Sequence, residues 1–187
     1  NNVSVSFDVG GVTQTAVTAS NTFTVDRKID VLVDFAGTAA TSVAPGAQNQ
    51  VLAFDVTNLS NAVVDIRLAA ALNAGNAANI ANFEVYRDTN GDRSLSAAEL
   101  AAGPITYLDE VAADGTVAVI VIADIGLGAV NGNEFDVVLT GTAREGGTAG
   151  TQGAAITQTA GANTAGVDTV FTDGAGTTDA ARDGAYS

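Results

Sequence analysis

"VLAFDVTNLSNAVVDIRLAAAL", residues 51–72, contains two runs of alternating apolar and polar side chains with a short polar link between them. The apolar side chains at every second position are Leu52, Phe54 and Val56 in the first run, and Val64, Ile66 and Leu68 in the second. Because successive side chains of a strand point to opposite faces, this period of two predicts two half-buried strands. Strands that recur with short turns are typical of an antiparallel sandwich.

Working outward from this stretch, similar runs recur with short turns between them. The run "TVAVIVIADI" (116–125) is continuously apolar, which is typical of a central strand covered on both faces. Only "SLSAAELAA" (94–102) favours a helix, of two turns at most. The sequence therefore predicts an all-β fold, an antiparallel immunoglobulin-like or jelly-roll β-sandwich with one short helix. The predicted core residues are Phe35, Phe54, Val56, Ile66, Phe83, Val85, Val119, Val121, Phe135, Val137 and Leu139.

The two ends of the chain differ from this central part. Residues 1–19 predict an N-terminal strand or hairpin, with Gly10-Gly11 as a two-residue turn that takes positive φ at both positions. The main sandwich is expected at 20–145. Its first run, 22–35, is too long for an ordinary strand, so it is one bent strand, or a strand shared by two sheets or by two molecules. Residues 146–187 are rich in Gly, Ala and Thr and are either added strands or a flexible linker.

The composition excludes several classes of function. Lys and Arg total 7 against 21 Asp and Glu, a net charge of −14, which disfavours binding to nucleic acid or anionic lipid. The chain has no Cys and no His, which argues against zinc sites, thiol nucleophiles and His-based triads. No signal peptide or membrane span is recognisable, so a secreted form is expected to be a processed chain that begins at Asn1.

The segment "RDTNGDRSLSAAEL" (87–100) has the oxygen spacing of an EF-hand calcium loop. The candidate ligands are Asp88, Asn90, Asp92, Ser94 and Glu99, with Ser96 acting through water and Asp109 as an added ligand from the next strand. Position 6 of this loop is Arg93, where an EF-hand has glycine, so a strand-loop variant is favoured over a true EF-hand. The alternative is a metal-free Asx turn that joins a strand to a helix.

No catalytic arrangement is expected. Asp109 and Glu110 are adjacent, and on a regular strand they point to opposite faces, so they are not expected to act together on one substrate. The sequence has neither a phosphate-binding glycine loop nor a Gly-Xaa-Ser-Xaa-Gly nucleophile motif. The chain is therefore predicted not to be an enzyme.

Several segments resemble known surface proteins. "VAPGAQNQVLAFDVTNLSNAVVDIRL", "FEVYRDTNGD", "LDEVAADGTVAVIVIADI" and "NEFDVVLTGTA" are similar to the conserved repeat domains of bacterial cell-surface proteins. A looser likeness is to the biofilm-matrix fibre and camelysin group and to archaeal bundling pili. These proteins share a layout in which Pro-Gly precedes a strand and Asn follows it. The resemblance implies secretion, a structural role and, in the fibre-forming relatives, a terminal strand that completes the sheet of the next subunit.

Two functions follow from these observations. The first is a structural subunit of an extracellular filament of a prokaryote, which binds copies of itself by donating the strand that carries Val3, Val5, Phe7 and Val9. Nothing earlier in the chain anchors that apolar strand, although it could simply pair with residues 12–18 as a hairpin on its own sandwich. The second is a non-polymerising adhesion module of a larger surface protein, stabilised by calcium.

Overall fold

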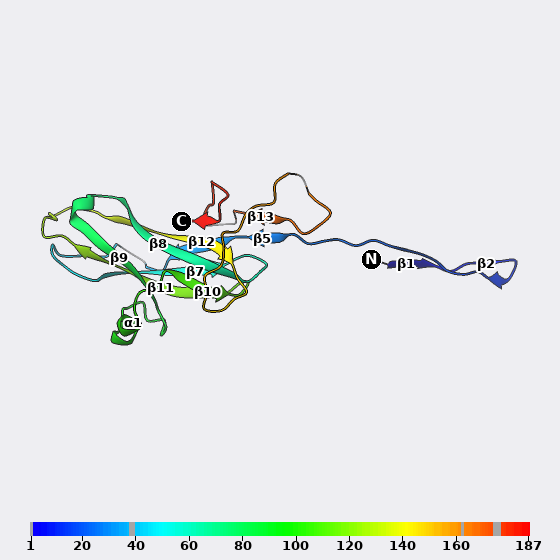
Figure 1. Ribbon diagram of the computed structural model, residues 1–187, viewed down its shortest axis with the longest axis horizontal. Coiled ribbons are helices and arrows are strands. Elements are labelled where there is room, and N and C mark those ends of the chain that lie inside the picture. The colour runs from blue at the N-terminus through cyan, green and yellow to red at the C-terminus, as the bar shows by residue number, and fades with distance from the viewer. Residues whose placement is uncertain (1, 38–39, 162, 174–176) are drawn as a thin grey trace.

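The computed structural model describes residues 2–37, 40–161, 163–173 and 177–187, and its regular secondary structure is mainly β-strand (Figure 1). Two four-stranded antiparallel sheets pack face to face, with the orders β6-β7-β11-β9 and β10-β8-β12-β14. The first sheet contains β6 (Val31–Phe35), β7 (Gln50–Asn58), β11 (Thr116–Ile125) and β9 (Ile80–Arg87). The second contains β10 (Tyr107–Val111), β8 (Val64–Ala74), β12 (Asp136–Glu145) and β14 (Ala185–Tyr186). The predicted antiparallel all-β sandwich is confirmed.

Two helical segments accompany the strands. The predicted short helix is α1 (Ala97–Ala102), and a single 3₁₀ turn, η1 (Ala77–Asn79), precedes β9. Ser96 caps α1: its hydroxyl accepts from the Glu99 amide, while the Glu99 carboxylate accepts from the Ser96 amide. This capping box satisfies backbone donors that the first turn of a helix would otherwise leave unpaired.

The core between the sheets is built from the alternating residues that the sequence indicates. Seven of the predicted core residues are buried: Phe54, Val56, Ile66, Val85, Val119, Val121 and Leu139. Phe83 and Val137 are half-buried and pack against this core, whereas the half-buried Phe135 packs against a smaller cluster of Ile80, Ala123 and Ile125. Strand β11 is also covered on its outer face, where Ile120 and Ile122 pack with Tyr86. The prediction of a central strand buried on both sides is confirmed.

The prediction that Phe35 belongs to the core is wrong. Its side chain is 41% exposed, although its ring meets that of Phe54 edge-to-face, with 5.6 Å between the centroids. Phe35 is the last residue of β6, the edge strand of its sheet, so it stands at the margin of the sandwich where β6 ends and β7 continues. The alternation of the sequence gives the face of the sheet but not the point at which a strand stops.

The long run 22–35 is shared by two sheets. It contains β5 (Arg27–Ile29) and β6, and the chain breaks between them at Asp30. Asp30 leaves the ladder because its amide donates to the Ser60 hydroxyl and its carbonyl accepts from the Leu59 amide. β5 then pairs in parallel with β13 (Thr169–Phe171), while β6 pairs antiparallel with β7.

The C-terminal segment contributes to the core. Ile156, Phe171 and Tyr186 are all buried within the main hydrophobic cluster. Strand β14 adds to the edge of β12, and the Tyr186 hydroxyl donates to the carbonyls of Ile29 and Thr172 at 3.0 and 3.3 Å. The described part of residues 146–187 therefore supplies added strands, one of which closes part of the edge of the sandwich.

The N-terminal residues form a hairpin that stands apart from the sandwich (Figure 1). In it, β1 (Asn2–Val5) pairs with β4 (Val17–Ser20), and β2 (Asp8–Val9) pairs with β3 (Val12–Thr13). Gly10 and Gly11 have φ of 61° and 82°, which confirms a turn with positive φ at both positions. An extended segment, residues 21–26, joins the hairpin to β5.

Candidate functional site

Three regions carry the features that the sequence singles out: the N-terminal arm (residues 2–26), the loop 88–99, and the carboxylates around Asp109. The arm exposes apolar side chains along its whole length. The four residues of the predicted donor strand are among them, and the set is Val3, Val5, Phe7, Val9, Val12, Val17, Phe23 and Val25. Their exposed fractions run from 45% for Phe7 to 80% for Phe23. Single exposed apolar residues are ordinary, whereas eight large ones within residues 2–26 give this arm an unusually apolar surface.

The hairpin of the arm is amphipathic. Val5 faces Val17 and Val3 faces Ala19 across the β1–β4 pair, so these four side chains share one face. The opposite face carries Asn2, Ser4, Thr18 and Ser20. A two-stranded ribbon is marginally stable in water, because it has no second layer on which to bury its apolar face. One expected alternative is a hairpin that packs on its own sandwich. The residues do form a hairpin, but it extends away from the sandwich (Figure 1).

In the loop 88–99, the predicted ligand oxygens accept hydrogen bonds from nearby amides. The buried Asp88 carboxylate accepts from the amides of Gly91 and Arg93, at 2.7 and 3.0 Å. The Asp92 carboxylate accepts from the Ser94 amide and from the Asn90 side-chain amide, both at 2.9 Å. These are the contacts of the metal-free alternative, an Asx turn that leads into a capped helix. Calcium binding at this loop stays a prediction.

Arg93 fixes the loop against the sandwich. Its φ is 61°, the left-handed conformation that an EF-hand loop assigns to glycine at this position. Its guanidinium forms a two-pronged ion pair with Asp55 on β7, with nitrogen–oxygen distances of 2.7 and 2.9 Å. The residue that departs from the EF-hand pattern is therefore the residue that attaches the loop to the neighbouring strand.

Glu99 accepts more hydrogen bonds than any other carboxylate of the loop. It is 3% exposed, and it accepts from the amide and hydroxyl of Ser96 and from the amide and hydroxyl of Thr89. These hydrogen bonds, those from the Ser96 and Thr89 amides first, lower the pKa of the Glu99 carboxyl from 4.5 to about 2.

Acid is therefore expected to weaken the fold through Glu99. Its folded pKa lies below its unfolded pKa, so the stabilisation is present above about pH 4.5 and is lost as the pH falls toward 2. Glu99→Gln should be less stable than the wild type at pH 7 and should lose less stability between pH 5 and pH 2. Urea unfolding at several pH values measures this, with Glu134→Gln, a change at an exposed carboxylate, as the control. If the free energy of unfolding falls with pH by the same amount in wild type and in Glu99→Gln, the predicted role of Glu99 is contradicted.

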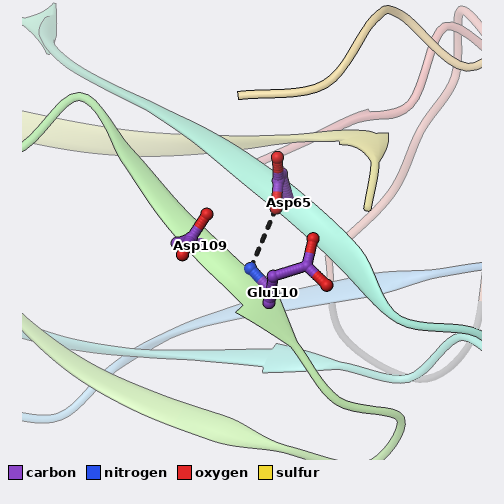
Figure 2. A group of neighbouring side chains, drawn as sticks. All are labelled: Asp65, Asp109 and Glu110. Carbon is purple, nitrogen blue, oxygen red and sulfur yellow. Dashed lines mark hydrogen bonds between the residues drawn. The ribbon is translucent and has the colours of Figure 1, made fainter. Parts of the chain in front are cut away.

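Asp109 does not join the loop 88–99. Within the described part of the chain, the one group of three carboxylates with ligand atoms within 4.8 Å of one another is Asp65, Asp109 and Glu110. Figure 2 shows Asp65 on β8 beside Asp109 and Glu110 on the neighbouring strand β10. This group could hold a metal ion. The sequence pattern predicts Asp109 as a metal ligand but gives no such signal for Asp65 or Glu110.

A β-bulge brings the two adjacent carboxylates together. Leu108 lies opposite Ile66 and Val111 lies opposite Val64, so Asp109 and Glu110 both lie opposite the single residue Asp65. Glu110 has φ of 50°, and its amide donates to Asp65 at 2.9 Å. The expectation that Asp109 and Glu110 point to opposite faces is therefore wrong, because it holds only for a regular strand.

The loop that follows β12 donates amides to all three carboxylates. Gly153 donates to Asp65 at 2.8 Å, and Gly150 donates to both oxygens of Asp109 at 2.9 Å. Glu110 accepts from Gly147 and Thr148. A side chain at position 153 would overlap the Glu145 carbonyl, so glycine is needed for this close approach. Asp65 is fully buried beneath this loop, whereas Asp109 is exposed.

Comparisons with known proteins add no assignment. No family model matches this chain, and neither a curated protein nor a solved structure is significantly similar to it. In the described residues, no helix combines the length and the apolar character needed to cross a bilayer.

Proposed function

We propose that this chain is a structural, non-catalytic subunit of an extracellular filament of a prokaryote, and that it polymerises through its N-terminal arm. The arm carries the proposal: it extends away from the sandwich and exposes eight large apolar side chains. Covering such a side chain contributes roughly 1.5–3 kcal/mol when burial is complete, so several of them support a durable contact between subunits. The lack of cysteine and the acidic composition fit a secreted protein that needs no disulfide.

Head-to-tail contact follows from the position of the arm. An arm that binds a different surface on the next copy forms a heterologous contact, and repetition of such a contact gives an open filament when the rotation does not close a ring. The body carries most of the −14 charge, whereas residues 2–20 contain only one charged side chain, Asp8. The arm can therefore approach an acidic neighbour with little repulsion between like charges.

The filament is tested by altering the arm. Val3→Thr, Val5→Thr and Val17→Thr keep the shape and β-branching of the side chains but place hydroxyl groups on the apolar face. We expect the wild type to form fibres in negative-stain micrographs and the triple variant to remain monomeric. Ser4→Thr with Thr18→Ser, changes on the polar face, should leave the fibres intact. Deletion of residues 1–20 should also yield monomers, and a truncated chain that forms the same fibres would refute the proposal.

The second candidate is a non-polymerising adhesion module of a larger surface protein, stabilised by calcium. The observation that favours it is the group of Asp65, Asp109 and Glu110, since hard cations such as calcium are bound by carboxylate oxygens. In this role the ion would hold the loop 147–153 against β8 and β10, and the arm would lead to a neighbouring domain. A wild-type protein that stays monomeric at every concentration, but is stabilised by calcium, would favour this function over the filament.

Calcium binding is expected to raise the melting temperature. An ion that binds only the folded state stabilises it by mass action, by about 2.7 kcal/mol at 100 times the dissociation constant. A chelator should therefore lower the melting temperature of the wild type. Asp109→Asn should abolish that difference if the ion binds beside Asp65, whereas Asp88→Ala with Glu99→Ala should abolish it if the ion binds in the loop 88–99. Identical melting curves with and without chelator would exclude both sites.

A further inference from the structure

A large apolar cleft opens at one end of the sandwich. Its volume is about 1000 Å³, and it lies between residues 40–45 and the connection that joins β11 to β12. The apolar side chains that line it include Phe35, Val43, Leu52, Val130, Phe135 and Val137. Phe35, whose exposure the sequence does not predict, stands in this cleft.

The cleft lies where both sheets have an unpaired strand edge. β6 pairs with β7 only from Asn58 to Phe54, and one further hydrogen bond joins the Ala36 amide to Ala53. In the second sheet, β14 pairs with Gly141 and Thr142 of β12. Among the described residues, no strand pairs with Gln50–Leu52 on the side away from β11, or with 136–140 on the side away from β8.

These two open edges lie on the same side of the sandwich. β6 packs across from β12, since a Cβ at Gly141 would lie 3.2 Å from a methyl of Val33. β6 and β14 cover part of this side, and the cleft begins at the last residue of β6, Phe35, and at Asp136 and Val137 of β12. The open stretch of β12, residues 136–140, is about 16 Å long at the usual rise of a strand. That length accommodates one short strand such as β1.

The arm and the cleft are at opposite ends of the molecule. Arg27, where the arm joins the sandwich, forms an ion pair of 2.8 Å with Glu145, the last residue of β12. The cleft is lined by Asp136, the first residue of the same strand. A strand of ten residues is about 30 Å long, so the arm of one copy and the cleft of the next can meet head to tail.

We propose that this cleft is the acceptor site for the arm of a second copy, an inference that rests on the proposed filament. The apolar face of the β1–β4 ribbon, with Val3 and Val5, enters the cleft and continues the line of β14 along the open edge of β12. Its main chain then hydrogen-bonds residues 136–140 of β12, and its valines cover Phe35 and Leu52 across the cleft. The near absence of charge in residues 2–20 suits a cleft whose rim carries Glu134 and Asp136.

Charges placed in the cleft test the site. Val130→Asp with Phe35→Asp introduces two carboxylates at positions that are 65% and 41% exposed, so the free subunit can hydrate them and stay folded. Covering them with an apolar strand would desolvate them, so the critical concentration for assembly should rise at least about tenfold. Leu100→Asp with Val63→Asp is the matched control, at exposed apolar positions outside the cleft, and should assemble normally. Thermal melting verifies that both variants are folded.

Crosslinking identifies the occupant. The chain has no cysteine, so Val5→Cys and Val137→Cys each introduce a single thiol. When these two single variants are mixed with a short bifunctional thiol crosslinker, a crosslinked heterodimer is expected. A crosslink that forms only within the chain of the double variant would mean that the arm folds back into its own cleft, and it would overturn the inference.

The outcomes separate the inference from the proposed filament. If the changes in the arm abolish the fibres but the charged cleft assembles like its control, the filament stands and the acceptor site is elsewhere. If the wild type forms no fibres, the proposed function fails, and the mixed crosslinking decides the inference alone: a heterodimer supports the cleft, and its absence overturns it. Crosslinking that stops when Val3 and Val17 are changed to Thr would further support the apolar face as the part that is bound.

Discussion

Val56→Asp is expected to unfold the sandwich. Val56 lies in the middle of β7, its side chain is fully buried, and it packs in the main cluster between the two sheets. A carboxylate there has no partner, and burying an unpaired charge costs several kcal/mol, to which the lost apolar contacts of valine add. Domains are typically stable by about 5–15 kcal/mol, so the variant should have no cooperative thermal transition and should lack the circular dichroism of a folded β-protein.

The neighbouring position supplies the control. Thr57 follows Val56 on the same strand, points to the other face and is half-buried, with its hydroxyl 2.8 Å from that of Thr116. Thr57→Asp should remain folded, with a loss on the order of 1 kcal/mol for that hydrogen bond. A folded Val56→Asp protein would mean that the two faces of β7 have been assigned the wrong way round.

Tyr186→Ala is expected to lower the free energy of unfolding by about 3–5 kcal/mol, the usual loss for a large aromatic side chain removed from a core. Tyr186 is the penultimate residue, yet its side chain is fully buried among Ile29, Phe171 and the strands of the second sheet. Burial, with the nearby Asp179, raises the pKa of its hydroxyl well above the usual value. Urea unfolding of the purified variant measures the loss.

Tyr186→Phe separates packing from hydrogen bonding. It keeps the ring and removes the hydroxyl that donates to the Ile29 and Thr172 carbonyls, so a loss of about 0.5–1.5 kcal/mol is expected, because the Ile29 carbonyl still accepts from the Thr172 amide. Equal stability of wild type, Tyr186→Phe and Tyr186→Ala would show that β14 does not hold the C-terminal segment in the core. A large effect of the alanine variant would mean that this segment cannot be removed as a linker.

The edge strand of a sheet can be covered by a segment of the same chain or left open to a second molecule, and this protein shows both arrangements. β14 brings Tyr186 back to close part of the edge of β12 within one molecule. The other part of that edge stays open beside the cleft, while the arm displays apolar side chains that its own sandwich does not cover. Unpaired strand edges and exposed apolar ribbons are prone to association. In the proposed filament, the apolar arm of one subunit binds the unpaired edge of the next subunit.

The sequence identified the features that depend on neighbouring residues. The alternation around Phe54 and Ile66 predicts strands and their inward faces, the Gly10-Gly11 pair predicts a tight hairpin turn, and the serine before "AAEL" predicts a capped helix. Each of these signals acts through side-chain direction or backbone conformation within a few residues. It can therefore be recognised from the local sequence alone.

Tertiary structure decided what depends on segments far apart in sequence. The bulge that places Glu110 beside Asp109 and Asp65 arises from the register between β10 and β8, which no local pattern encodes. The sequence of the C-terminal segment is equally compatible with a linker, because its few bulky residues show no period. Only the space left between the two sheets determines that Phe171 and Tyr186 fill it. The cleft also depends on segments that are far apart in the sequence. The local alternation predicts the direction in which Phe35 points, but the lengths of β6 and β14 determine where the edge of the sandwich is left open.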